Sequence, residues 1–273
     1  MNHQEYFSSK VIAITGGSDG IGRAIINLLL PLGAKIATCG RDSNKLDLLQ
    51  KNNPDAQERL FCIKADVSDR SECAFFIEET LKRFGKIDIL INNAGISMRA
   101  MFEAADPDVI KRVMDVNFMG AVYCSHYALS SIIKQQGTIV GISSIAGYRG
   151  LPGRSGYSAS KFALNGWMES IRTELSPYNV NVLWISPGFT KSNIRNAALN
   201  EKAEAQGESP LDESALMSSE ECATHILRAI VKRKRTLILG FQGKQTIFLN
   251  KLFPSLTDKL IRKFFFKEGK LIK

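Results

Sequence analysis

Residues 11–22 read Val-Ile-Ala-Ile-Thr-Gly-Gly-Ser-Asp-Gly-Ile-Gly, an apolar run that passes directly into a glycine-rich turn. The run predicts a strand over 11–15, and apolar positions three and four apart predict a helix over 21–32. Glycines at such a turn let the backbone approach a pyrophosphate, whose charge is attracted by the free N–H groups at the start of the helix. The glycines alone equally fit an ordinary strand-to-helix turn, but the strand before and the helix after favour a dinucleotide-binding turn.

The same alternation of short apolar runs and longer helical patterns continues along most of the chain. Strands are predicted at 35–39, 61–65, 87–91, 138–142, 180–185 and 236–239, and helices at 68–84, 108–133, 158–175 and 219–232. Several runs have few polar residues, as expected for parallel strands buried on both faces. We therefore expect one α/β domain with a doubly wound parallel sheet of about seven strands and helices on both faces. Pro31 should stop or kink the first helix.

The composition is that of an ordinary globular protein, with 44% hydrophobic and 23% charged residues in a chain of 273. These values argue against disorder, a collagen-like repeat or a disulfide scaffold. The chain has five cysteines, which are scattered and never in C-x-x-C spacing. This pattern fits a reducing compartment and disfavours a zinc or redox site. The sequence shows neither a spanning apolar run nor a signal-like start, so we expect a cytoplasmic protein, with a peripheral membrane location as an alternative.

The net charge of +9 is concentrated at one end of the chain. Residues 1–231 hold 24 Lys/Arg against 25 Asp/Glu, a net charge of −1, whereas residues 232–273 hold 12 against 2, a net charge of +10. The chain therefore has a nearly neutral body and a basic C-terminal extension, which does not suit a basic globule that binds nucleic acid.

Further motifs follow the glycine turn in a fixed order. They are Asp66-Val67, Asn92-Asn93-Ala94-Gly95, Asn117, Ser144, Tyr157-x-x-x-Lys161 and Pro187-Gly188. In this order and spacing, and with the G-x-x-x-G-x-G turn, residues 8–240 resemble the short-chain dehydrogenase/reductase family. Within it, residues 145–161 resemble dehydrogenase/reductase 7-type and 3-ketosphinganine reductase-like members. The resemblance implies a Rossmann-type fold for residues 1–240, and an oxidoreductase that transfers hydride between a nicotinamide cofactor and a carbonyl or alcohol.

The residues after the second strand bear on the choice of cofactor. NAD-specific folds place an acid there to bind the ribose 2′-OH, but this chain has Gly40 followed by Arg41. A guanidinium can form two parallel hydrogen bonds with a 2′-phosphate, so NADP(H) is favoured. The alternative is that Arg41 is a solvated surface residue. Asp19 departs from the basic residue that many NADP-preferring members carry there. The full set of expected cofactor contacts is Gly16, Ser18, Asp19, Gly20, Ile21, Gly22, Arg41, Asp66, Val67, Asn93, Ala94, Gly95, Tyr157, Lys161, Pro187, Gly188, Thr190 and Ser192.

Tyr157 and Lys161 are four residues apart in a predicted helix, so their side chains share one face. The Lys161 ammonium favours the phenolate form of Tyr157, which lets the phenol exchange protons near neutral pH. Such a pair is common on any helix. Ser144, thirteen residues earlier at a strand end, favours a catalytic role for this one. By resemblance, Ser144 binds the substrate oxygen, with Ser143 as runner-up, and Asn117 holds a water that links Lys161 to solvent. The alternative for Asn117 is an ordinary polar helix residue.

The polar stretch 193–218 is long for a connector and predicts a substrate lid over about 190–218. Ile194, Ala197, Ala198 and Leu199 are expected to form a helix face towards the site. The alternative is a mobile loop that touches no ligand. Residues 145–156 should form the opposite wall, and Met98 and Met101 suit either an adaptable apolar pocket or core filling.

The extension over 241–273 carries apolar residues at helical spacing with Lys and Arg between them, and Pro254 can begin its last helix. Such a helix can lie in a membrane interface, or its apolar stripe can pack on the domain or on a partner subunit. A homodimer or homotetramer is expected from the resemblance, through helices near 108–133 and 157–175.

The preferred hypothesis is an NADPH-dependent reductase of a bulky or lipid-like ketone. The alternatives are a soluble NAD(P)-dependent dehydrogenase of another secondary alcohol and a cofactor-binding scaffold without turnover. The only histidines are His3, His126 and His225, which show no metal-ligand spacing, so no metal is expected.

Overall fold

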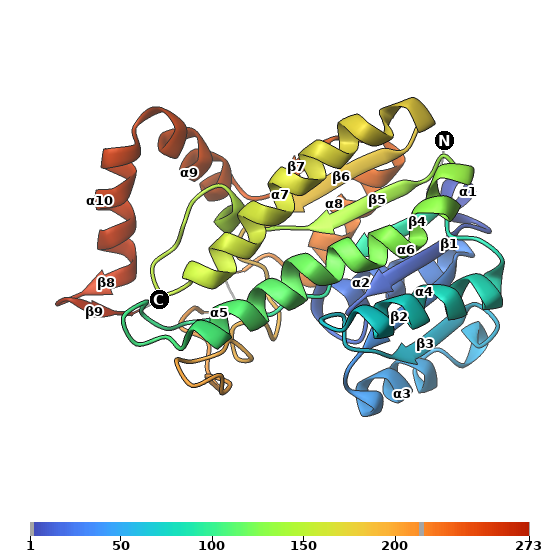
Figure 1. Cartoon of the computed structure of the whole chain (residues 1–273), viewed down its shortest axis with the longest axis horizontal. Helices are drawn as coiled ribbons and strands as arrows, with labels where there is room; N and C mark the ends of the chain where they lie inside the picture. Colours follow the sequence, from blue (N-terminus) through green and yellow to red (C-terminus); the bar gives the residue numbers. More distant parts are fainter. Residues whose placement is uncertain (1–2, 213–215, 273) are drawn as a thin grey trace.

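The computed structural model describes residues 3–212 and 216–272, and within these residues the chain is built around a parallel sheet (Figure 1). The sheet has seven strands in the order β3-β2-β1-β4-β5-β6-β7. These strands are β1 (Val11–Thr15), β2 (Lys35–Gly40), β3 (Leu60–Lys64), β4 (Ile89–Asn92), β5 (Thr138–Ile142), β6 (Asn181–Ser186) and β7 (Thr236–Ile238). The predicted fold class, strand number and parallel pairing are confirmed.

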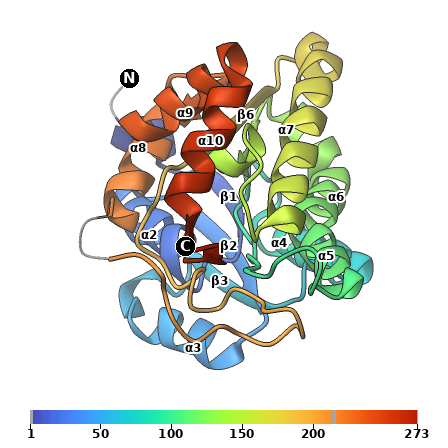
Figure 2. The same ribbon diagram turned by 90° about the vertical axis from the view of Figure 1, so that its left-hand side faces the viewer.

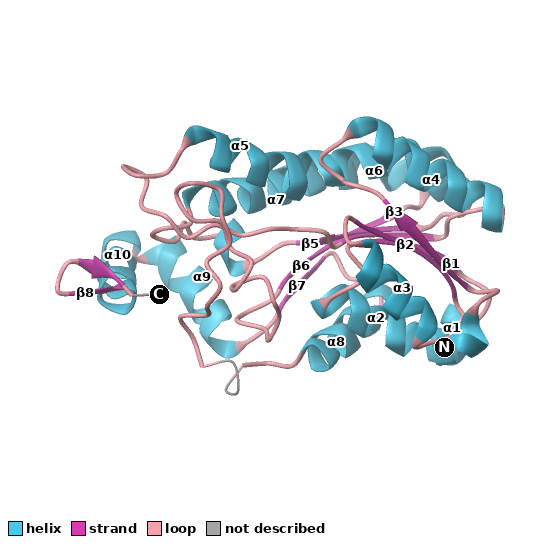
Figure 3. Cartoon of the chain, turned by 90° about the horizontal axis from the view of Figure 1, so that it is seen from below, coloured by secondary structure: helices cyan, strands magenta, loops and turns pink. Residues whose placement is uncertain are grey.

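Helices cover both faces of the sheet (Figure 3). One face carries α1 (His3–Phe7), α2 (Gly20–Leu29), α3 (Ser43–Lys51) and α8 (Ser219–Val231). The other carries α4 (Arg70–Phe84), α5 (Pro107–Met114), α6 (Gly120–Lys134) and α7 (Ser155–Leu175). Alternate residues of β1 show why both layers are stable, because Ile12 and Ile14 enter one buried cluster and Ala13 enters the other.

The helix boundaries differ from the sequence prediction where proline or local geometry intervenes. At Pro31 the α2 helix gives way to a 3-10 turn (Leu30–Leu32), as expected for a residue without a backbone donor. The predicted helix over 108–133 contains a π-helical segment (Asp115–Met119) between α5 and α6. The α3 helix was not predicted, since only Leu46 and Leu49 on it are buried, and Asp42 caps its first turn.

The strand order reverses between β1 and β4, which lie side by side although β2 and β3 come between them in sequence. In a doubly wound sheet, such a reversal opens a crevice beyond the carboxyl ends of the strands. The glycine turn leaves β1 at this edge, and Asn92-Asn93 leaves β4 there, so the topology brings these two motifs together.

The C-terminal extension forms a helical hairpin, α9 (Phe241–Leu252) and α10 (Pro254–Phe265), followed by a two-stranded ribbon, β8 (Phe266–Lys267) and β9 (Lys270–Leu271). Figure 2 shows α9 and α10 beside the carboxyl ends of the sheet strands. Pro254 stands at the start of α10, as predicted. None of the described helices is both long and apolar enough to cross a membrane.

The hairpin is fastened to the loop that precedes α7. Arg149 forms an ion pair with Asp258 and donates a hydrogen bond to Asn250, whose amide in turn donates to the carbonyl of Tyr148. The hydroxyl of Tyr148 accepts a hydrogen bond of 2.8 Å from the indole of Trp184 in β6. These contacts tie the extension to the central sheet.

Candidate functional site

The glycine turn is shaped so that a ligand can approach its backbone closely. Gly16 has φ +70°, and a Cβ on Gly22 would lie 2.4 Å from the carbonyl oxygen of Gly16. The amide of Asn93 donates to the carbonyls of Thr15 and Gly16, both at 3.0 Å. The turn therefore has no room for a side chain at Gly16 or Gly22 and is held in place from β4, an arrangement that suits a pyrophosphate.

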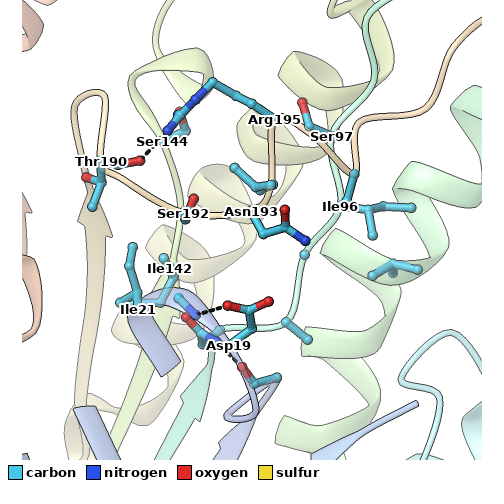
Figure 4. Close-up of a pocket in the computed structure, with 18 of the residues that line it drawn as sticks. Asp19, Ile21, Ile96, Ser97, Ile142, Ser144, Thr190, Ser192, Asn193 and Arg195 are labelled. Carbon is cyan, nitrogen blue, oxygen red and sulfur yellow. Dashed lines mark hydrogen bonds between the residues drawn. The ribbon is translucent and has the colours of Figure 1, made fainter. Parts of the chain in front are cut away.

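A cleft of about 510 Å³ extends from this turn past the ends of β4, β5 and β6 (Figure 4). This volume lies in the range of ordinary small-molecule sites. All the predicted cofactor residues except Gly22 line it, and so do Ser144, Tyr157 and Lys161. Gly22 and Asn117 stand behind the lining residues, where they shape the turn and the neighbouring helix.

One end of the cleft carries charged side chains from the glycine turn, the residues after β2, α3 and the segment after β3. Nη1 of Arg41 lies 3.8 Å from Oδ2 of Asp66. The other carboxylate oxygen of Asp66 accepts hydrogen bonds from the amide and the hydroxyl of Ser68. Asp19 caps α2 and is paired with Lys45. Sequence reasoning missed Lys45, because it lies on α3 and its pairing with Asp19 spans 26 residues.

Tyr157 and Ser144 meet near the other end of the cleft. Burial raises the pKa of the Tyr157 phenol above its ordinary value of 10.0, while its hydrogen bond with Ser144 and the nearby guanidiniums of Arg154 and Arg195 oppose that rise. The Ser144 hydroxyl also accepts a bond from the Ala146 amide and so caps the short turn after β5. Ser143 is buried and points elsewhere, against Gly147.

Lys161 lies one helical turn beyond Tyr157 and is almost fully buried. Its ammonium donates a 2.8 Å hydrogen bond to the carbonyl of Ile142 and lies 5.7 Å from the centre of the Tyr157 ring. Burial lowers the pKa of Lys161 to about 8. The structure therefore holds a cation of reduced basicity beside the phenol.

Asn117 lies in the π-helical segment and ties two elements together. Its amide donates to the carbonyl of Ile96 and to the hydroxyl of Ser160, each at 2.9 Å, and its oxygen accepts from the Ile96 amide. A Cβ on Gly95 would lie 3.2 Å from the Asn117 oxygen and 3.6 Å from the Lys161 nitrogen. The space between these two side chains thus depends on Gly95 having none.

The segment after β6 returns to the glycine turn. Pro187, Gly188, Thr190 and Ser192 line the cleft, and a Cβ on Gly20 would lie 3.4 Å from Ser192. Beyond them the predicted helix is wrong, because residues 193–197 form turns and Ala198 and Leu199 are buried, but Ile194 and Ala197 line the cleft as expected. The structural reason is that the backbone of Leu199 bonds to that of Ser97 and Arg99 instead of continuing a helix.

Met98 belongs to the small buried cluster around Leu199, whereas Met101 is exposed. Residues 213–215 of the predicted lid lie outside the described residues, as do 1–2 and 273 of the predicted domain and extension.

The loop 145–156 contributes Leu151 and Arg154 to the cleft, and the segment after β6 contributes Arg195. Sequence reasoning missed both arginines, because single arginines in loops carry no spacing signal.

The described residues hold no group of three His, Cys, Asp or Glu side chains placed to bind a metal ion. The chemistry of the cleft is that of hydroxyl, amide and cationic side chains around a glycine cradle.

Comparisons with known proteins agree with this architecture. Residues 10–203 match the family model described as short chain dehydrogenase. The chain is 33% identical over 259 residues to dehydrogenase/reductase SDR family member 7B of Xenopus laevis, covering 92% of this chain and 80% of that protein. It is 32% identical over 261 residues to 11-beta-hydroxysteroid dehydrogenase-like 2 of Arabidopsis thaliana, covering 95% and 82%.

Two solved structures share the fold. A short-chain dehydrogenase from Streptomyces avermitilis is 26% identical with a TM-score of 0.79, covering 95% of this chain and all of that one. A short chain dehydrogenase/reductase from Burkholderia phymatum, in complex with NAD, has a TM-score of 0.82 at 23% identity and covers 92% and 95%. The predicted family and its 7-type resemblance are thus confirmed, and the chain belongs to the short chain dehydrogenase family of oxidoreductases, which interconvert alcohols and carbonyl compounds.

Proposed function

We propose that the protein is an NADP(H)-dependent reductase of bulky, lipid-like ketones. The observation that carries this proposal is the meeting of Ser144, Tyr157 and Lys161 in one cleft with the glycine turn. The cradle around Gly16 and Gly22, which any Cβ would fill, fits a dinucleotide pyrophosphate. When bound, the nicotinamide supplies or accepts a hydride.

The chain's own residues position the substrate and move its proton. The Ser144 hydroxyl donates a hydrogen bond to the carbonyl oxygen, next to the Tyr157 hydroxyl, which delivers the proton to that oxygen. Lys161 stabilises the phenolate that remains, because its ammonium is held close to the ring. Asn117 positions the segment around Ile96 against α7 and leaves a space, beside Gly95, for a water between it and Lys161.

The preference for NADP(H) is supported by charge at the end of the cleft that carries Arg41. Arg41 and Lys45 both line the cleft there, and Gly40 stands where an acid would repel a 2′-phosphate. Asp19, the residue that departs from the expected pattern, is paired with Lys45 at 2.7 Å. Its negative charge is thus balanced locally.

A lipid-like substrate is supported by the aromatic wall that the extension adds beside the cleft. The Phe264 ring stacks on Phe189, which lines the cleft, and Phe265 is buried under the guanidinium of Arg154. Leu271 lies against Gly153, so the last ribbon closes the same wall. Phe189 and Phe264, both partly exposed, offer apolar surface to a hydrocarbon chain, while the buried Phe265 packs edge-on against Phe264.

Peripheral membrane binding through the extension is part of this proposal. The described part of the extension exposes Phe241, Phe248, Leu252, Phe253, Leu256, Leu260 and Phe264. Lysines and arginines alternate with them, so the surface suits anionic lipid. Sedimentation with phosphatidylcholine/phosphatidylserine vesicles should exceed that with phosphatidylcholine alone, and Leu256→Asp with Leu260→Asp should abolish it. Phe75→Asp, an exposed apolar site on α4, is the control, and equal sedimentation of all three proteins would refute the lipid contact.

A homodimer or homotetramer is also proposed, formed through the outer faces of α6 and α7. Phe162 on α7 is 47% exposed and offers an apolar centre for such a contact. Light scattering should give a multiple of the chain mass, and Phe162→Asp should lower it; a monomeric wild type would refute the interface.

A cytoplasmic location fits the five free cysteines, four of them buried.

The function is tested by following NADPH absorbance with ketones of increasing chain length. Turnover should rise with chain length and be lost in Tyr157→Phe by at least about 1,000-fold, with cofactor affinity largely kept. Retained turnover in this variant would remove the proposed proton donor. Binding of the dinucleotide without turnover of any ketone or alcohol would favour the scaffold alternative, and faster oxidation of short secondary alcohols would favour the dehydrogenase.

A further inference from the structure

The helix α7 carries three polar side chains at intervals of four residues, Tyr157, Lys161 and Asn165. Residues four apart lie on the same face of a helix, so these side chains form one row along α7. Tyr157 and Lys161 line the cleft, whereas Asn165 does not line it and is only 8% exposed. The row therefore has a third polar member, one turn beyond Lys161, that the mechanism has not used.

Asn165 binds the short turn that follows β5. Its side-chain amide donates a 2.9 Å hydrogen bond to the carbonyl of Gly147, the last residue of the 3-10 turn (Ile145–Gly147). The contact is close, because a Cβ on Gly147 would lie 2.7 Å from the Asn165 nitrogen and 2.8 Å from the carbonyl oxygen of Lys161. The turn thus packs directly on the backbone of α7 and on the Asn165 amide.

Ser144 stands at the start of the same turn, between two anchored positions. On one side, the backbone amide of Ser143 donates a 2.7 Å hydrogen bond to β6. On the other side, Gly147 is held by Asn165, and its own amide donates to the Ser144 carbonyl at 3.0 Å. These anchors fix the backbone around Ser144 and so direct its hydroxyl to Tyr157, with which it forms a hydrogen bond.

The Asn165 side chain is costly for stability where it lies. Asparagine is a poor helix former, and the side-chain oxygen of Asn165 is buried without a hydrogen-bond partner among the described residues. A buried polar atom without a partner destabilises the folded state. Leucine, which has about the same size, would avoid this cost but could not donate to Gly147. The bond to the turn is therefore what this residue type adds.

We propose that Asn165 is a positioning residue for the reaction: by holding Gly147, it keeps the Ser144 hydroxyl where it and Tyr157 can contact the same substrate oxygen. This inference rests on the proposed function, because it needs Ser144 to bind that oxygen. One helix then carries the proton donor and, through Asn165, also fixes the group that binds the substrate beside it. A displacement of about 1 Å between such groups can lower turnover by about 100-fold.

Asn165→Leu removes the donor and keeps the approximate size of the side chain. The probe is the methyl ketone, in a series from pentanone to dodecanone, that the wild type reduces fastest with NADPH. For this ketone, kcat/KM should fall by about 10- to 100-fold. The calorimetric Kd for NADPH should stay unchanged, because neither Asn165 nor Gly147 lines the cleft. The number of NADPH sites in the titration counts the folded enzyme, and the melting temperature should change by less than about 4 °C.

Gly147→Ala tests the same contact from its other side. The added Cβ meets the Asn165 amide and the backbone of α7, so the turn must move although Asn165 is intact, and kcat/KM should fall in the same way. Gly166→Ala on α7 is the matched control, because nothing lies within 4 Å of its Cβ position. Asn53→Leu removes a 2.8 Å amide bond to the carbonyl of Leu49 and is the control for Asn165→Leu. Both controls should keep the wild-type kcat/KM.

A double-mutant cycle separates the positioning of Ser144 from other effects of the substitution. Ser144→Ala should lower kcat/KM by about 100-fold or more. Adding Asn165→Leu to it should cost less than about 3-fold further, since no hydroxyl is left to misplace. Purely structural damage, or an effect through Lys161, would make the two losses multiply.

Losses that multiply in the cycle would overturn the inference, and so would a wild-type kcat/KM in either Asn165→Leu or Gly147→Ala. These outcomes would leave the reductase proposal intact. A wild-type rate in Ser144→Ala, or no reduction of any ketone in the series by the wild type, would instead refute the proposed function.

Discussion

The ammonium of Lys45 lies 2.7 Å from a carboxylate oxygen of Asp19, so α3 is joined to the cap of α2 across the mouth of the cleft. Burial opposes ionisation of Asp19, but the hydrogen bonds from Lys45 and Gly20 outweigh it, and the pKa of Asp19 is lowered. The acid is therefore ionised and neutralised by a partner that the glycine motif itself does not contain.

Removing Arg41 or Lys45 from this end of the cleft should weaken the preference for NADPH over NADH. Arg41→Ala should raise KM for NADPH by about 10- to 100-fold and leave KM for NADH nearly unchanged, because only the former carries the 2′-phosphate. Lys45→Ala should also weaken NADPH, since Asp19 then repels the phosphate, and adding Asp19→Asn should restore part of the loss. Steady-state kinetics with both cofactors measures this, and equal losses for the two cofactors would contradict the phosphate contact.

The buried charge of Lys161 should reduce stability. Its pKa falls from 10.5 to about 8, which corresponds to about 3 kcal/mol of unfavourable free energy for the ammonium below pH 8. Lys161→Met should therefore raise the melting temperature of the cofactor-free protein at pH 7 by several degrees, even after the loss of its bond to Ile142, while abolishing turnover.

The same shift predicts a pH dependence. Between pH 8 and 10.5 the unfolded chain holds the Lys161 proton and the folded chain does not, so wild-type stability rises with pH relative to Lys161→Met. Urea unfolding of both proteins at pH 7 and pH 10 measures the difference. A stability gap that stays constant over this window would show that Lys161 is not the titrating group.

The glycine cradle can be tested by adding one methyl group. Gly22→Ala would place a Cβ 2.4 Å from the Gly16 oxygen, so the turn must shift, and affinity for the dinucleotide should fall by about 10-fold or more. Gly150→Ala is the matched control, because nothing lies within 4 Å of its Cβ position. Calorimetric titration with NADPH compares them, and unchanged affinity in Gly22→Ala would exclude a close backbone contact with the pyrophosphate.

The link between the extension and the loop before α7 should affect the substrate more than the cofactor. Arg149→Ala removes the contacts with Asp258 and Asn250, which should loosen α9 and α10, increase their cleavage by trypsin and raise KM for the ketone. KM for NADPH should change little, because Arg149 is not among the residues that line the cleft. Arg262→Ala, exposed on α10, serves as the control. An equal rise in both KM values would indicate a general loss of folding instead.

Much of this architecture could be predicted from local pattern. The apolar runs predicted the seven strands, since strands buried on both faces are continuously apolar, and the spacing of Tyr157 and Lys161 placed both on one helix face. Lys45, Arg154 and Arg195 could not be found in this way, because their positions in the cleft follow from tertiary packing. The helix expected near Leu199 was wrong for the same reason: its backbone bonds to Ser97 and Arg99 replaced helical ones.

Trp184 connects the sheet with the extension through Tyr148 and Asn250, and the guanidinium of Arg172 lies 4.7 Å from its ring. The sequence contains one other tryptophan, Trp167. Replacing Trp167 by phenylalanine would leave a single indole whose N–H reports, through its emission wavelength and quenching, on the loop that the extension holds. The protein thus carries an intrinsic fluorophore from which movement of the extension relative to the sheet can be followed in real time without a label.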